Sequence, residues 1–116
     1  MKKILVVEDE EGIQLLYQEE FQEEGYEVIS AFTGEEALEK FRSEVPDLVI
    51  LDIQLPGMNG IEVLRQMKMV APQLPIILST AFDQYKQDLS VWASDEFIVK
   101  SPDLQKLKEA VRKYLG

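Results

Sequence analysis

Two kinds of hydrophobic pattern alternate along the chain. Four short segments, residues 3–7, 48–51, 76–78 and 97–99, are apolar at nearly every position, as expected for strands that are covered on both faces of a sheet. A fifth segment, residues 26–32, mixes apolar and polar positions and is predicted to be a strand nearer the sheet edge. Between these segments apolar residues recur every three or four positions, which indicates helices that bury one face.

One helix is predicted in each gap between the first four strands. The first carries apolar side chains at positions 13, 16, 17 and 21 and ends at Gly25, a residue type that commonly follows the last helical turn. The second begins at Thr33, which forms a capping box with Glu36. The third follows the break at Gly60, where Gly57 and Gly60 are interpreted as turn glycines.

Two further helices complete the pattern. Residues 83–92 form a fourth helix with few apolar anchors, and Ser101 and Pro102 are predicted to be the N-cap and first residue of a fifth. Because strands and helices alternate with short connections, the strands must be parallel and linked by right-handed crossovers. The sequence therefore predicts a single domain over residues 1–116, an α/β doubly wound parallel sheet of five strands in the flavodoxin-like order 2-1-3-4-5.

Polar residues occur where the predicted strands end. They are Glu8 and Asp9 after the first strand, Asp52 after the third, Thr80 after the fourth and Lys100 after the fifth. In a sheet of this order ligands bind beyond the carboxyl ends of the strands, where the strand order reverses. We therefore expect these five side chains to surround one site.

Composition excludes several other functions. The chain has 116 residues and a net charge of −10, with no cysteine and no histidine, so disulfides, thiolate metal sites and an imidazole base are ruled out. No apolar run is long enough for a membrane span or a signal peptide, so a cytoplasmic protein without membrane contact is expected. The acidic balance argues against direct binding of nucleic acid, because phosphate backbones select basic surfaces.

The predicted site suits a hard cation and a phosphoryl group. The carboxylates of Glu8, Asp9 and Asp52 would repel one another unless a cation neutralised them, and oxygen ligands in an open site suit Mg²⁺. The breaks after Asp52 would let the backbone carbonyl of Gln54 turn toward the metal. Asp52 is the candidate nucleophile, because a carboxylate needs no general base to attack phosphorus.

Two more side chains would complete such a site. Lys100 would contribute a positive charge on one flank of the phosphoryl group, and Thr80 a hydroxyl donor on the other.

Four motifs, "ILVVEDE", "LVILDIQLPGMNGIEVL", "PIILSTA" and "FIVKS", occur in this order and cover the whole chain. Together they resemble the receiver domain of bacterial two-component response regulators. The resemblance implies a signalling domain, rather than an enzyme, that accepts a phosphoryl group from a histidine kinase or a histidine phosphotransfer protein. By this resemblance Asp52 is the phosphoacceptor, Glu8 and Asp9 hold Mg²⁺, Thr80 is the switch hydroxyl, Lys100 is the family lysine and Phe97 takes the place of the switch aromatic.

The chain departs from the family pattern at three positions. Glu8 replaces the usual first aspartate of the acidic pair, and Phe97 lacks the hydroxyl of the usual tyrosine. Ser101 replaces the proline that usually follows the lysine in a cis peptide bond. Because a cis bond before a residue other than proline is costly, we expect the Lys100–Ser101 bond to be trans.

Other functions with related chemistry fit less well. A haloacid-dehalogenase-type phosphatase would need a second acid where Gln54 stands, and a flavin or nucleotide module would need a phosphate-binding loop where the chain reads "EDEEG". A pseudo-receiver that binds partners without phosphorylation remains the alternative. No output domain follows the last predicted helix, which fits either a stand-alone regulator or part of a longer protein.

Two consequences of the resemblance concern signalling. A downstream protein is expected to bind the face formed by residues 83–92, the last strand and the basic last helix, with Trp92 near it. Gln54 and Phe82 are expected to flank the path of the water that hydrolyses an aspartyl phosphate. Because the ring of Phe82 would cover that path with apolar surface, slow self-dephosphorylation is predicted.

Overall fold

The computed structural model of the chain describes residues 1–81 and 94–116. Its elements, in chain order, are β1 (Lys3–Val7), α1 (Glu11–Glu23), β2 (Glu27–Ala31), α2 (Gly34–Glu44), β3 (Leu48–Leu51), α3 (Gly60–Val70), β4 (Ile76–Thr80), β5 (Glu96–Val99) and α4 (Gln105–Leu115). The helix predicted over residues 83–92 lies outside the described residues, as do Phe82 and Trp92.

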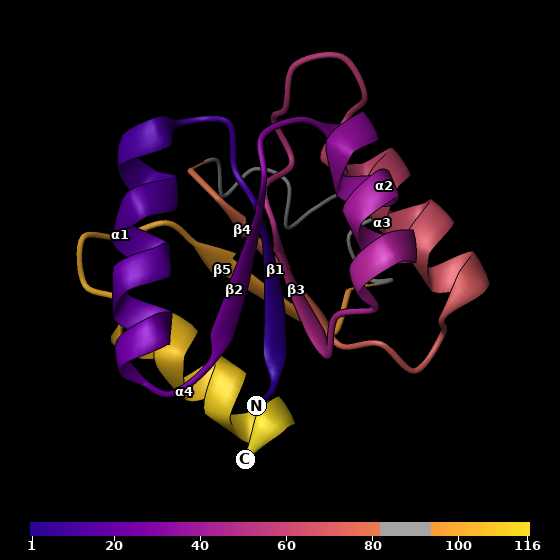
Figure 1. Cartoon of the computed structure of the whole chain (residues 1–116). Helices are drawn as coiled ribbons and strands as arrows, with labels where there is room; N and C mark the ends of the chain where they lie inside the picture. Colours follow the sequence, from indigo (N-terminus) through magenta and orange to yellow (C-terminus); the bar gives the residue numbers. More distant parts are fainter. Residues whose placement is uncertain (82–93) are drawn as a thin grey trace.

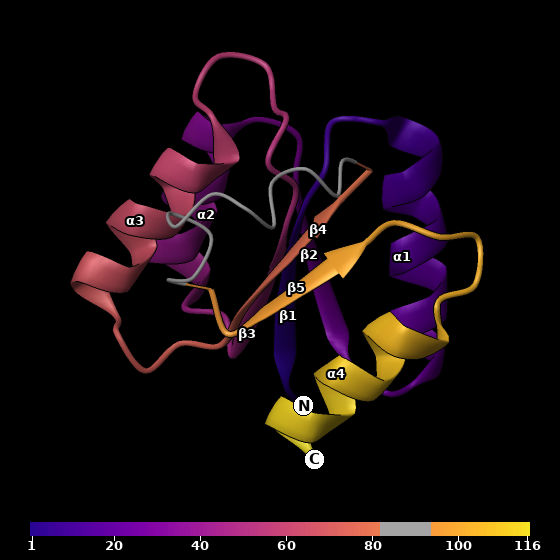
Figure 2. The same ribbon diagram turned by 180° about the vertical axis from the view of Figure 1, so that it is seen from behind.

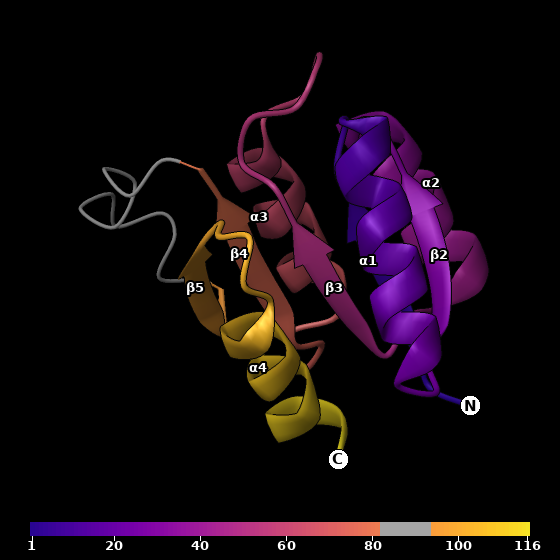
Figure 3. The same ribbon diagram turned by 90° about the vertical axis from the view of Figure 1, so that its left-hand side faces the viewer.

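The five strands form one parallel sheet in the order β2-β1-β3-β4-β5. This confirms the predicted topology, and Figure 3 shows the sheet from its face, with α1 and α4 in front of it and α2 and α3 behind it. The strand β2, which contains both polar and apolar residues, lies at an edge of the sheet and is less buried than β1 or β3. The same arrangement places the carboxyl ends of β1 and β3 side by side, with Val7 paired to Leu51.

Two layers of helices cover the sheet. Among the described elements, α1 and α4 lie on one face and α2 and α3 on the other (Figures 1 and 2). Successive strand residues contribute to opposite faces, so that Ile4 belongs to the core under α1 and α4 while Leu5 belongs to the core under α2 and α3. Burial on both faces explains why the strands are apolar throughout.

Two predicted helix ends are confirmed by their hydrogen bonds. The Thr33 hydroxyl accepts the N–H of Glu36 at 3.0 Å, as an N-cap should. The second bond of the predicted capping box differs, because the Glu36 carboxylate accepts the N–H of Phe32 and not that of Thr33. At the end of α1, Gly25 has a φ of +98°, and the N–H of Tyr26 donates to the Phe21 carbonyl at 3.1 Å. This pattern is a Schellman motif, which places a glycine in the left-handed region directly after the helix.

The predicted start of the last helix is wrong. Helix α4 begins at Gln105, with Leu104 in the N-cap position, and not at Pro102. Before it, the Ser101 hydroxyl accepts the N–H of Asp103 at 3.2 Å, and an Asp103 carboxylate oxygen accepts the N–H of Gln105 at 3.0 Å. These local bonds hold the backbone in turns, a conformation for which short polar side chains compete with the helix.

Ion pairs join the acidic first helix to the basic last helix. Lys108 lies 2.5 Å from Glu20, and Arg112 lies 2.8 Å from Glu24. The acidic residues of α1 therefore pair with the helix that lies beside them. The stripe predicted on α1 is buried at Tyr17 and Phe21, whereas Leu16 is exposed.

Val45, the residue that follows α2, adopts a strained backbone conformation. Its φ is +49° and its side chain is 74% exposed. The left-handed region costs a residue with a Cβ roughly 1–2 kcal/mol, is especially rare for a β-branched residue, and is more accessible to asparagine. Since little burial would be lost, we predict that Val45→Asn raises the free energy of unfolding by about 1 kcal/mol.

Urea denaturation of the variant against wild type measures this effect. The matched control is Val70→Asn, because Val70 is 73% exposed at the end of a right-handed helix and the two residue types have similar helix propensities. The control should change stability little. An equal gain in both variants would mean that the backbone conformation of Val45 is not the cause.

Candidate functional site

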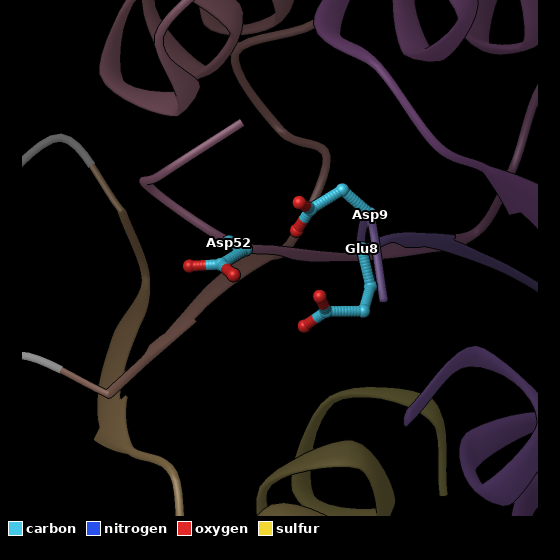
Figure 4. Close-up of side chains that lie close together, drawn as sticks. All are labelled: Glu8, Asp9 and Asp52. Atoms are coloured by element: carbon cyan, nitrogen blue, oxygen red, sulfur yellow. The ribbon is translucent and has the colours of Figure 1, made fainter. Parts of the chain in front are cut away.

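Three carboxylates meet at the carboxyl edge of the sheet. Glu8 and Asp9 follow β1 and Asp52 follows β3, and each offers an oxygen that lies within 4.8 Å of the others. Figure 4 shows the side chains of Glu8 and Asp9 extending toward the side on which Asp52 lies. The sequence predicted this convergence from the order of the strands. Carboxylate oxygens at such spacing form a donor set that suits Mg²⁺.

Lys100 balances part of this negative charge. Its ammonium nitrogen lies 2.8 Å from Oδ2 of Asp52 and also pairs with the carboxylate of Glu8. Lys100 follows β5, whereas Asp52 follows β3 and Glu8 follows β1. These ion pairs therefore connect the ends of three strands, across the intervening strand β4. One ammonium against three carboxylates leaves the site negative, and a divalent cation would compensate for the remainder.

Burial perturbs the charged groups of the site. Glu8 is only 2% exposed, and this burial raises the pKa of its carboxyl despite the hydrogen bonds from Lys100 and from the N–H of Glu10. For Lys100 burial alone would lower the pKa, but the hydrogen bonds to Asp52 and Glu8 outweigh it and the pKa is raised. The lysine therefore remains charged at neutral pH.

Asp52 is held by its neighbours but is not fully enclosed. It is 7% exposed, and its Oδ1 accepts the backbone N–H of Gln54 at 3.3 Å. The other oxygen, Oδ2, faces Lys100. Gln54 itself is exposed beside Asp52. The metal-binding role expected for its backbone carbonyl stays a prediction.

The two residues expected to act in switching lie in different environments. Thr80 is fully buried at the end of β4, and its carbonyl accepts the N–H of Lys100 at 2.7 Å. Phe97 is half-buried in β5 and packs against the core under α2 and α3. The Lys100–Ser101 bond is trans, as expected, since no peptide bond in residues 1–81 and 94–116 is cis.

Gly60 does more than end a turn, so its sequence interpretation is incomplete. A Cβ added to it would lie 2.0 Å from the carbonyl oxygen of Asp52 and 2.7 Å from Cα of Ile53. Its N–H donates to the Ile53 carbonyl at 2.8 Å. Helix α3 therefore starts in direct contact with the backbone of the central aspartate, and only glycine permits this approach. Gly57, with a φ of +74°, is a turn glycine as predicted.

Sequence reasoning missed Gln14 beneath the site, and it counted Tyr17 only as part of the apolar stripe. Gln14 of α1 is 1% exposed and bonds to the ends of β1 and β2. Tyr17, one turn later, is also buried, and this burial raises the pKa of its hydroxyl, which interacts with Ser79 of β4. The signal was the spacing of positions 14, 17 and 21, which places a glutamine on the buried face of an amphipathic helix.

Comparison with known proteins gives a consistent result. The family model of the response regulator receiver domain matches residues 4–112 of this chain. Sporulation initiation phosphotransferase F of Bacillus subtilis is 39% identical over 117 residues, which cover 98% of this chain and 94% of that protein. The transcriptional regulatory protein PhoP of the same organism is 49% identical over 83 residues, covering 72% of this chain but only 35% of the longer protein.

Solved structures show the same likeness. The response regulator TrrA of Thermotoga maritima in complex with Mg(2+)-BeF is 53% identical, with a TM-score of 0.96 and coverage of 99% of this chain and 100% of that one. A chain in the complex of the histidine kinase ThkA with TrrA is 52% identical, with a TM-score of 0.93 and coverage of 100% of this chain and 100% of that one. Among the described residues, no helix is long and apolar enough to span a membrane.

The contact between Gly60 and Asp52 generates a prediction. We expect Gly60→Ala to lower the free energy of unfolding by about 1–3 kcal/mol or more, because the added methyl overlaps backbone atoms that cannot rotate away. The matched control is Gly12→Ala in α1, where nothing lies within 4 Å of the added Cβ. This control should leave the free energy of unfolding unchanged or raise it by up to roughly 0.5–1 kcal/mol, since alanine is the better helix residue. Chemical denaturation compares the two, and equal effects would contradict the proposed overlap.

Proposed function

The chain belongs to the family of response regulator receiver domains, and from this membership we propose that it accepts a phosphoryl group on Asp52 in a Mg²⁺-dependent reaction. The observation that carries the proposal is the convergence of Glu8, Asp9, Asp52 and Lys100 at the carboxyl edge of the sheet. In this role the protein is a phosphoacceptor for signalling and not an enzyme with a separate substrate.

The metal would be held by Glu8, Asp9 and Asp52, with the backbone carbonyl of Gln54 as a further ligand. The oxygen-only donor set of the three acids supports Mg²⁺. Further support comes from TrrA, at 53% identity, whose structure contains Mg(2+)-BeF. When bound, the metal would neutralise charge on the carboxylates and on the phosphoryl oxygens.

The residues of the chain have distinct parts in the transfer. A carboxylate oxygen of Asp52 forms the bond to phosphorus while the bond between phosphorus and the donor's histidine nitrogen breaks, and the electron pair stays on that nitrogen. Lys100, already 2.8 Å from Asp52, offsets the charge on the phosphoryl oxygens. Thr80 supplies a hydroxyl donor to the phosphorylated form, and Phe97 follows it as the switch aromatic.

The phosphoryl donor would be a histidine kinase or a histidine phosphotransfer protein. The complex of TrrA with the kinase ThkA supports a kinase partner. An open groove of about 290 Å³ lies beside Lys100, lined by apolar side chains that include Ile13 and Leu16 of α1, and Pro102 and Leu104 before α4. Exposed Leu16 contributes here to a surface on which a donor helix can bury apolar side chains.

The phosphorylated protein would act on a downstream protein in the cytoplasm. The proposed surface includes β5 and α4, which line a hollow of about 380 Å³ with side chains such as Phe97 and Lys106. Much of the basic charge of α4 is already paired within the chain, including Lys113 with Glu96. Slow self-dephosphorylation stays a prediction, since Gln54 is exposed beside Asp52 whereas Phe82 lies outside the described residues.

Phosphorylation by a small donor tests this function directly. Incubation with acetyl phosphate and Mg²⁺, followed by intact-mass measurement, should add one phosphoryl group to the wild type. The gain should disappear in Asp52→Ala and when EDTA removes the metal, but should persist in Asp103→Ala, a control at an exposed aspartate outside the site. No gain in the wild type, or an unchanged gain in Asp52→Ala, would contradict the assignment.

A further inference from the structure

Gln14 lies where a polar side chain is unusual. It is the fourth residue of α1, is 1% exposed, and points toward the ends of β1 and β2. On the same face of the helix Tyr17 and Phe21 are buried as well. Glutamine is mostly found at protein surfaces, because burying its amide requires partners for both its donor and its acceptor. Its presence here therefore needs a physical reason.

The amide of Gln14 gathers three backbone carbonyls. Its Nε2 lies 2.8 Å from the Val6 oxygen, 2.9 Å from the Ala31 oxygen and 3.3 Å from the Glu8 oxygen. Its own Oε1 is buried and has no hydrogen-bond partner among the described residues. The amide cannot turn over, because Oε1 would then face three carbonyl oxygens. The two hydrogens of Nε2 are thus shared among three carbonyl oxygens, with the contact to Glu8 the longest, while Oε1 has no partner among the described residues.

The Glu8 carbonyl needs this donor because β2 has ended. The N–H of Glu8 still bonds to the carbonyl of Ala31, the last residue of β2, at 3.0 Å. A parallel ladder advances two residues at a time, so the next donor would have to come from Thr33. Thr33 is instead the N-cap of α2. Gln14 donates to the Glu8 carbonyl in place of this backbone N–H. The Ala31 carbonyl accepts hydrogen bonds from both Glu8 and Gln14.

This bond acts on Asp9 through the backbone. The Glu8 carbonyl belongs to the peptide unit between Glu8 and Asp9, so Gln14 helps to fix the plane from which the Asp9 side chain departs. Glu8 has further restraints, since its carboxylate accepts the N–H of Glu10 at 3.0 Å and pairs with Lys100. Asp9 is exposed, and within residues 1–81 and 94–116 its carboxylate makes no hydrogen bond. The backbone therefore fixes the point from which the Asp9 side chain departs and the direction of its Cα–Cβ bond.

We propose that Gln14 is a positioning residue for the metal site, which orients Asp9 by holding the Glu8–Asp9 peptide unit against the end of β2. The inference rests on the proposed function, because it assumes that Asp9 is a ligand of Mg²⁺. Groups that orient metal ligands from behind commonly change metal affinity by about 10–100-fold when they are replaced. Gln14 would orient Asp9 from behind in this way, through the peptide unit that it holds.

Substitution separates positioning from general stability. Gln14→Met keeps the size and flexibility of the side chain but removes the donor. Gln18→Met is the matched control, because Gln18 lies one turn later on α1 and also bonds to β2, but through the hydroxyl of Ser30 and not through the peptide unit of Glu8 and Asp9. Calorimetric titration with Mg²⁺ should show about tenfold weaker binding in Gln14→Met. Gln18→Met should bind Mg²⁺ as the wild type does.

A split in the kinetics adds a readout that a purely structural role would not change. In Gln14→Met the Mg²⁺ concentration for half-maximal phosphorylation by acetyl phosphate should rise about tenfold, while the rate at saturating Mg²⁺ stays close to that of wild type. If Gln14→Met lowers the unfolding midpoint without metal but binds Mg²⁺ like the wild type, Gln14 only attaches α1 to the sheet and the inference is wrong.

A measurement on the wild type keeps the test valid if the variant does not fold. In an NMR titration with Mg²⁺ the side-chain amide signals of Gln14 should shift with the same midpoint as the backbone amide of Asp9, and those of Gln18 should not. An unchanged Gln14 signal, while Asp9 shifts, would overturn the inference alone. If neither Asp9 nor calorimetry detects Mg²⁺ binding to the wild type, it is the proposed metal site that fails.

Discussion

The ammonium of Lys100 between two buried carboxylates is the interaction on which the site depends. A parallel sheet in this strand order brings the ends of β1 and β3 together, and each end carries acidic residues. Glu8 and Asp52 are nearly buried, so water screens their repulsion poorly. Lys100 contacts both of them from β5. Lys100 thus offsets part of the negative charge of acidic groups that lie close enough to share a metal.

Backbone contacts give this charged cluster its shape. Gly60 allows α3 to begin against the carbonyl of Asp52, and a methyl group at this position would collide with it. Gln14 supplies a donor to the Glu8 carbonyl where β2 has already ended. Both contacts act on peptide units and not on the carboxylates themselves. The backbone around Glu8 and Asp52 therefore determines where their side chains begin. Asp9 remains exposed to solvent and accessible to a ligand.

Most of the fold followed from hydrophobic pattern, because strands covered on both faces are apolar throughout and helices covered on one face are not. The strand order then placed Glu8, Asp9, Asp52 and Lys100 together, since the carboxyl ends of parallel strands share one edge. Propensity alone misplaced the start of α4. Ser101 and Pro102 suit a helix start, but Ser101 and Asp103 bond locally and delay the helix to Gln105.

The contacts of Gly60 and Gln14 could not be predicted from the sequence in the way that the strands and helices could. A glycine that permits a close approach and a glycine that permits a turn look alike in sequence, and only the packing of α3 against Asp52 distinguishes them. Gln14 gave a weak signal as a polar residue on a buried helical face. What it binds depends on where β2 ends, which local pattern does not determine.

The central claim is that Lys100 is the counter-charge that makes the buried carboxylates tolerable. A double-mutant cycle of Asp52→Asn and Lys100→Met, measured by chemical denaturation in Mg²⁺-free buffer, tests it most directly. We predict a favourable coupling energy of roughly 1–3 kcal/mol between the two side chains, as measured for other residues in direct contact. The parallel cycle of Asp103→Asn with Lys100→Met should give almost none. A coupling energy near zero between Asp52 and Lys100 would contradict the account.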